Sequence, residues 1–164
     1  MVQHHASAAD AQIMLQLFEL KRDPELRKAR NFCALEFWPR SADDVLRALP
    51  AFATPENSNL RQVIAFWEMA ASFVLRGALH EELFLDSAGE MFFLWAKLRP
   101  FIKEVREKLI AHELLVCVEK MVECSPKSQE RVARLEKRIA ERYAGVQSVT
   151  EPGGRYQPAV GRPA

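Results

Sequence analysis

The stretch NSNLRQVIAFWEMAASFVLRG, residues 57–77, decides the fold. In helical steps its polar side chains fall on one narrow stripe, while almost every other position is apolar. A helix that is apolar over most of its circumference is enclosed by its neighbours. We therefore predict a central helix over 57–77, with Asn57 or Ser58 as its N-cap and Gly77 just past its end. The stripe consists of Arg61, Ala65, Glu68, Ser72 and Arg76.

The length and composition indicate one folded domain. A chain of 164 residues, 49% hydrophobic and 27% charged, is long enough to bury a core without disulfides. The formal net charge of +1 favours neither nucleic acid nor an anionic membrane as a partner. Residues 126–164 carry 8 Lys/Arg against 4 Asp/Glu. Nucleic-acid binding is therefore unexpected except through the basic C-terminal helix.

The three cysteines indicate a reducing compartment. Their number is odd, they form no CxxC pair, and they lie within apolar helical patterns, which is typical of reduced thiols. The N-terminus lacks the cationic and apolar regions of a signal peptide, and no apolar run is long enough to cross a membrane. We expect a cytoplasmic protein without a membrane partner.

Three helices are predicted before the central one, and no strand alternation appears. The first spans residues 7–21. The second starts at Asp23-Pro24-Glu25 and ends before Pro39, because the residue preceding a proline resists the helical conformation. The third starts at Ser41.

After the central helix, the apolar phase predicts one kinked helix and a break. Residues 78–86 are expected to form a short helical turn or linker, and Asp86 or Ser87 caps the next helix. Its apolar phase continues through Pro100, which favours a kink over an end. The phase stops after Leu109, so we predict a break at 110–112 and a further helix to about 123.

The last helix is predicted over residues 125–144, with a thin apolar seam and charged faces elsewhere. Such a seam packs against one neighbour or against a second copy of the chain. Residues 1–6 and 145–164 are expected to be disordered. The fold class is all-α: a single bundle of about six helices over 7–124 around the buried central helix, followed by the extended amphipathic C-terminal helix. The seam residues are Val132, Leu135, Ile139 and Tyr143.

One short motif has a mechanism attached. Arg106 is followed by His112 in a helical context, and this pair resembles the signature of HEPN-type ribonucleases. The resemblance implies that the arginine steadies a phosphate while the histidine handles protons at the ribose hydroxyl. Glu107 departs from that pattern, because a carboxylate beside the arginine repels phosphate. The structural interpretation is that Arg106 is an exposed surface residue and His112 lies at the junction between two helices.

Metal ligation is weighed at three places and not expected. His80-Glu81-Glu82 and His112-Glu113 lack the spacing of HExxH, and solvated charges at helix starts explain them better. Cys117, Met121 and Cys124 share one helix face, which suits a soft metal, but such residues on an apolar face are usually core. We predict no metal and no cofactor.

Glu68 is the sole acid of the central helix, and a carboxylate on a mostly buried helix needs a partner. The structural interpretation is an ion pair with an arginine of a neighbouring helix, Arg99 or Arg106. The functional interpretation is a pocket or a general base. Arg61 and Arg76 complete this polar site.

The order Trp67-Glu68, Gly77, His80-Glu81-Glu82, Trp95 and Arg99-Pro100 resembles small all-helical bacterial domains of unknown function, over about residues 57–110. Such a family implies the fold and a bacterial cytosol, and leaves the activity open. We expect a non-enzymatic module acting through protein contacts, self-associating through the C-terminal helix or an exposed aromatic face. The alternative is a HEPN-like ribonuclease of a toxin or phage-defence system that uses Arg106 and His112.

Overall fold

The computed structural model describes the backbone of residues 5–150 and the side chains of 5–145. All regular structure in this part of the chain is helical, which confirms the all-α prediction. Most of the predicted disordered start, and the tail from residue 151 on, lie outside the described residues. The elements are α1 Ala8–Arg22, α2 Pro24–Asn31, a π-helical turn η1 Phe32–Glu36, α3 Ala42–Ala48, α4 Pro55–Leu75, α5 Glu81–Ser87, α6 Gly89–Leu98, α7 Ile102–Leu109, α8 Val116–Glu123 and α9 Pro126–Thr150.

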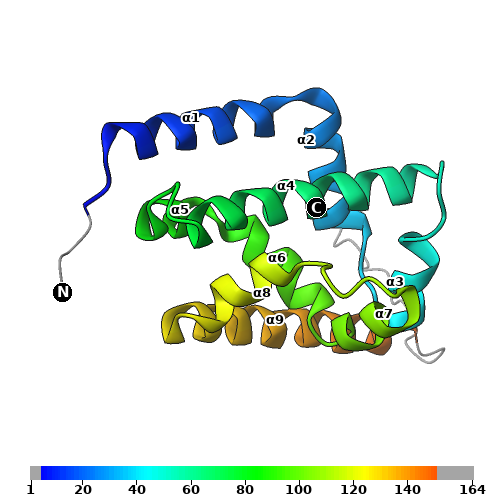
Figure 1. Cartoon of the computed structure of the whole chain (residues 1–164). Helices are drawn as coiled ribbons and strands as arrows, with labels where there is room; N and C mark the ends of the chain where they lie inside the picture. Colours follow the sequence, from blue (N-terminus) through cyan, green and yellow to red (C-terminus); the bar gives the residue numbers. More distant parts are fainter. Residues whose placement is uncertain (1–4, 151–164) are drawn as a thin grey trace, which may run out of the picture.

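Helix α4 is the predicted central helix. Figure 1 shows it crossing the molecule, with α1 along one side and α8 and α9 on the other. It packs directly against α2 and α8, and α9 closes the bundle against α6 and α8. Trp67 of α4 and Trp95 of α6 are both buried in the shared core, as expected from their apolar surroundings.

The two ends of α4 follow different rules. Thr54 is the N-cap, because its hydroxyl accepts the N–H of Asn57 at 3.2 Å and Pro55 occupies the first helical position. The predicted cap at Asn57 or Ser58 is therefore wrong, and the Asn57 amide instead donates to the backbone carbonyl of Ala48 at 3.2 Å. Gly77 follows the end as predicted, with a φ of 73°.

The predicted starts of the N-terminal helices are confirmed. Ser7 and Ser41 cap α1 and α3, and each forms a reciprocal capping box with the aspartate three residues on. Asp23 caps α2 with Pro24 in the first turn. These signals are local, so the sequence alone reveals them.

Pro100 ends a helix, and the predicted kink is wrong. Helix α6 stops at Leu98 and α7 begins at Ile102. Proline has no N–H to donate, and the next N–H, that of Phe101, bonds to the Leu98 carbonyl at 2.9 Å in a turn. Arg99 and Phe101 keep right-handed helical dihedrals. The apolar periodicity therefore continues through Pro100, although the regular helical hydrogen bonds are interrupted there.

At the remaining helix junctions, the structure confirms one predicted boundary and corrects others. The predicted break at 110–112 is confirmed, since Ile110 adopts a left-handed conformation. The expected linker after Gly77 contains the full helix α5, and Ala88 occupies the N-cap of α6 in place of Asp86 or Ser87. Helix α9 begins at Pro126 and continues past the predicted end at 144 to Thr150.

Candidate functional site

Glu68 caps another helix and makes no ion pair with the expected arginines. Its two carboxylate oxygens accept the backbone N–H groups of Cys117 at 2.7 Å and Val118 at 3.2 Å, at the start of α8. The helix has no side-chain cap of its own there. A carboxylate suits the partial positive charge of a helix N-terminus, so Glu68 ties α4 to α8.

The two arginines expected to pair with Glu68 have other partners. Arg99 pairs with Glu136 of α9 at 3.2 Å. Arg106 donates from Nε and one terminal nitrogen to the Leu114 carbonyl, at 2.9 and 2.7 Å, and from the other to Glu119 at 2.7 Å. The prediction of an arginine partner for Glu68 is therefore wrong.

Arg106 stabilises the turn between α7 and α8, which matters for the ribonuclease interpretation. All the contacts named above go to protein groups, and its side chain is mostly buried. His112 lies exposed in the same turn. A phosphate would have to displace a partly buried ion pair and two hydrogen bonds to a backbone carbonyl before reaching this guanidinium, so the geometry supports a structural Arg106.

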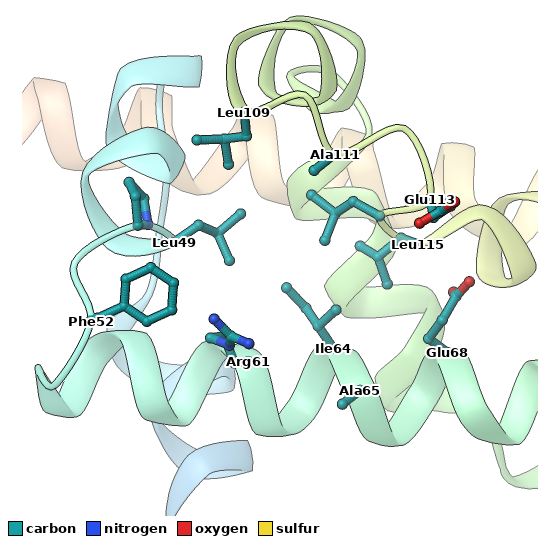
Figure 2. A pocket seen from close by; sticks show the side chains of 12 residues that line it. Leu49, Phe52, Arg61, Ile64, Ala65, Glu68, Leu109, Ala111, Glu113 and Leu115 are labelled. Carbon is teal, nitrogen blue, oxygen red and sulfur yellow. The ribbon is translucent and has the colours of Figure 1, made fainter.

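A cavity of about 570 Å³ lies between α4 and the turn that Arg106 stabilises. Figure 2 shows Arg61, Ile64, Ala65 and Glu68 along its α4 wall, facing the side chains of the turn. The predicted polar stripe therefore lines a cavity through Arg61 and Glu68. Arg76 does not line it and lies exposed at the C-cap of α4. The other lining residues are Leu49, Pro50, Phe52, Leu109, Ala111, Glu113, Leu114 and Leu115.

Arg61 holds the one positive charge of the cavity lining. Its guanidinium carbon lies 5.1 Å from the centre of the Phe52 ring. Within the described part of the chain it forms no ion pair with a carboxylate. The stacking on Phe52 leaves its donors available at the cavity mouth.

Helix α1 covers a second cavity and exposes apolar side chains. Among its side chains, Leu17 is the only apolar one that is buried, whereas Leu15 is 67% and Phe18 58% exposed. These two residues border a cavity of about 390 Å³ between α1, α4 and α5. Lys21 lies over the Trp67 ring, 5.0 Å from its centre, and burial lowers the pKa of this lysine.

Lys97 is a buried charge that the sequence analysis missed. It is 2% exposed, and its ammonium donates to the carbonyls of Cys33 at 2.7 Å, Ala34 at 3.2 Å and Phe37 at 2.9 Å. It also lies 3.6 Å from the centre of the Trp38 ring. Burial lowers its pKa to about 8. The signal was present, since Lys97 interrupts an apolar helix as Glu68 does.

The C-terminal seam packs inside the chain. Val132 and Ile139 are buried, and α9 lies against α6 and α8. The Tyr143 hydroxyl donates to the Pro39 carbonyl at 2.7 Å, while Leu135 is partly buried. The seam therefore packs against helices of the same chain. This is the first of the two expected outcomes, the other being packing against a second copy.

Two findings concern metals and membranes. Among residues 5–145, no three His, Cys, Asp or Glu side chains lie close enough together to hold a metal ion. Met121 is buried and Cys124 is exposed, so the helix face shared with Cys117 is divided between core and solvent. No helix in the described part of the chain is both long and apolar enough to span a bilayer.

These features define a small all-helical domain in which Glu68, Lys97 and Arg106 join helices and turns that are distant in the sequence. The family model of a domain of unknown function, DUF4760, matches residues 6–125, and the chain belongs to that family. The predicted resemblance to a small domain family of unknown function is confirmed, and the match extends well beyond residues 57–110. No curated protein and no solved structure matches the chain.

Proposed function

We propose that this domain is a non-enzymatic interaction module that pairs with a second copy of itself through the exposed apolar side of α1 that borders the second cavity. That surface, called the α1 face below, consists of Ala11, Leu15 and Phe18. The observation that carries the proposal is the exposure of two large apolar side chains three residues apart on one helix. Residues at this spacing share one side of a helix and form a continuous contact surface.

The α1 face is also free of charge. Residues 11–18 include no Asp, Glu, Lys or Arg. The centres of protein interfaces are depleted of charged residues, whose desolvation opposes binding. Two α1 faces related by a two-fold axis therefore meet without repulsion between like charges.

The groove beside the α1 face offers space for side chains of the partner helix. It has an almost entirely apolar lining that includes Leu83 and Phe84 of α5. A second copy of Phe18 inserted there would bury area on both partners. This supports the exposed aromatic face as the route of association, in place of the seam on α9, which is occupied within the chain.

The proposal is tested by light scattering over a range of protein concentrations. The wild type is expected to rise from the 18.7 kDa monomer towards twice that mass. Leu15→Glu with Phe18→Glu is expected to stay at the monomer mass, because each substitution brings a charge into the contact. Ile110→Asn is the matched control: Ile110 is 81% exposed, and α7 lies on the opposite side of α4 from α1 (Figure 1).

Two results would contradict the proposal. One is a wild-type protein that keeps the monomer mass at its highest soluble concentration. The other is a Leu15→Glu, Phe18→Glu variant that associates as strongly as Ile110→Asn. Far-UV circular dichroism confirms that all variants keep their helix content.

A further inference from the structure

We propose that the cavity between α4 and the α7–α8 turn binds a small apolar monocarboxylate, with Arg61 holding the carboxylate. The α7–α8 turn, which lines this cavity, lies on the opposite side of α4 from α1 (Figure 1), so the inference goes beyond the proposed self-association and does not depend on it.

The shape and lining of the cavity suit a small apolar body. Its volume of about 570 Å³ lies within the range of roughly 300–1,000 Å³ that small-molecule sites occupy. Ile64 and Ala65 form the α4 wall, and Leu109 and Leu115 lie across the opening from it (Figure 2). Leu114 also lines the cavity. An aliphatic or aromatic ligand there would remove apolar surface from water on both sides.

The two most exposed large apolar side chains of the described residues belong to the two loops at the cavity. Phe52 is 72% exposed and Ile110 81% exposed. Phe52 lines the cavity, and Ile110 stands between two lining residues, Leu109 and Ala111. Exposed apolar groups gathered at the mouth of a concave site mark a binding surface.

The backbone is strained in the same two loops. Ala53, Ile110 and Leu115 are the non-glycine residues of positive φ in the described part of the chain, at 69°, 51° and 58°. Leu115 lines the cavity, and the other two are neighbours of lining residues. A β-branched residue such as Ile110 is a clear outlier in this conformation. Strain of this kind gathers at ligand sites, where the fold holds a geometry that the ligand needs.

Charge decides the class of ligand. Arg61 has its donors at the cavity and no carboxylate partner among the described residues. A guanidinium binds a carboxylate in a bidentate, charge-assisted pair. Seven residues further along α4, roughly 10 Å in helical rise, Glu68 lines the other end together with Glu113 (Figure 2). A second carboxylate on the ligand would therefore meet two acids, which favours a single negative charge.

Isothermal titration with three ligands of equal chain length tests this assignment. Octanoate is expected to bind, and octanol, which lacks the charge, to bind about tenfold more weakly. Octanedioate is also expected to bind more weakly than octanoate, because its second carboxylate approaches Glu68 and Glu113. Equal affinity for octanoate and octanol, or no binding of octanoate, would overturn the proposal.

Two variants locate the site. Arg61→Gln is expected to reduce octanoate binding to the level of octanol, while Arg76→Gln, an exposed arginine on the same helix outside the cavity, leaves it unchanged. Ala65→Trp, which fills the cavity from an exposed position of α4, is expected to abolish binding of both ligands. If Arg61→Gln and Arg76→Gln bind octanoate equally, the inference is wrong. Circular dichroism checks that each variant is folded.

Discussion

Lys97 shows how a single buried charge organises the segment before α3. Its ammonium satisfies three carbonyls of residues 33–37, where the π-helical turn leaves the regular ladder. The Trp38 and Phe93 rings lie against the same group. Burial lowers the pKa of Lys97 to about 8 and raises that of the neighbouring Cys33 thiol to about 12.

The shifted pKa of Lys97 predicts a stability that rises with pH. The folded pKa of about 8 lies below the ordinary value of 10.5, so between these pH values the unfolded chain binds more protons than the folded one. The contribution of Lys97 to the free energy of unfolding should therefore increase from pH 8 to 10.5. Above about pH 9 the raised pKa of Cys33 acts in the opposite direction, because its thiol stays protonated in the folded chain, so the net increase is expected between pH 8 and 9. Urea titrations measure it, with Lys97→Met expected to lose this increase and the exposed Lys103→Met to keep it. A pH dependence identical in wild type and Lys97→Met would contradict the prediction.

Glu68 is expected to contribute to stability through the cap on α8. In Glu68→Gln one oxygen and the negative charge are lost at two backbone N–H groups. The free energy of unfolding should fall by about 1 kcal/mol, as for other lost caps. Glu113→Gln, an exposed acid at the same cavity, serves as the control and should change it by less than about 0.5 kcal/mol. Equal effects of the two substitutions in urea titrations would contradict this role.

The turn between α7 and α8 depends on Arg106, whose planar group bonds the Leu114 carbonyl twice. Lysine cannot reproduce this fork. Arg106→Lys should therefore speed amide hydrogen exchange over residues 109–118 by about fivefold, since the loss of one hydrogen bond is expected to cost roughly 1 kcal/mol. His112→Ala, in the same turn, should leave exchange there unchanged. Faster exchange spread evenly over the whole chain would show that the arginine has no local role.

Most helix starts could be predicted because their signals are local in the sequence. The predictions that were wrong concern residues whose partners are distant in the sequence or whose periodicity is ambiguous. Ser7, Asp23 and Ser41 announce helix starts because each cap bonds a backbone group two or three residues away. Asn57 looks like such a cap, but its amide donates to the carbonyl of Ala48 at the end of α3. Pro100 preserves the apolar phase while it ends the helix, and periodicity alone does not distinguish these cases.

The residues of the candidate site could be predicted from the sequence, but their distant partners could not. Arg61 and Glu68 stand out as charges on an apolar helix, and both line the cavity. The partner of Glu68 was not visible, because it is a pair of backbone N–H groups about fifty residues along the chain that carry no residue signature. The strained loops at Ala53 and Ile110 were equally hidden, since positive φ at these residue types has no sequence signal.

In the whole molecule, the residues that stabilise the fold are different from those that we propose to mediate association. This difference leads to a last prediction. Ile139 is buried between α9 and its neighbours in the same chain. Ile139→Asp places a charge in that core and should lower the free energy of unfolding by about 3 kcal/mol or more. Leu15→Glu with Phe18→Glu lies outside the core and should change it by less than about 1 kcal/mol, while abolishing self-association.

Each of the two variants should therefore change one property and leave the other nearly unchanged. The two properties are the stability of the fold and the mass of the associated protein. Thermal unfolding is expected to distinguish Ile139→Asp from the wild type, whereas light scattering distinguishes the α1 variant. This follows because a seam closed within one chain stabilises the monomer, and an uncovered face contributes only when a second copy covers it. If Ile139→Asp leaves the melting temperature unchanged and instead lowers the associated mass, then α9 is the interface and the α1 face is not.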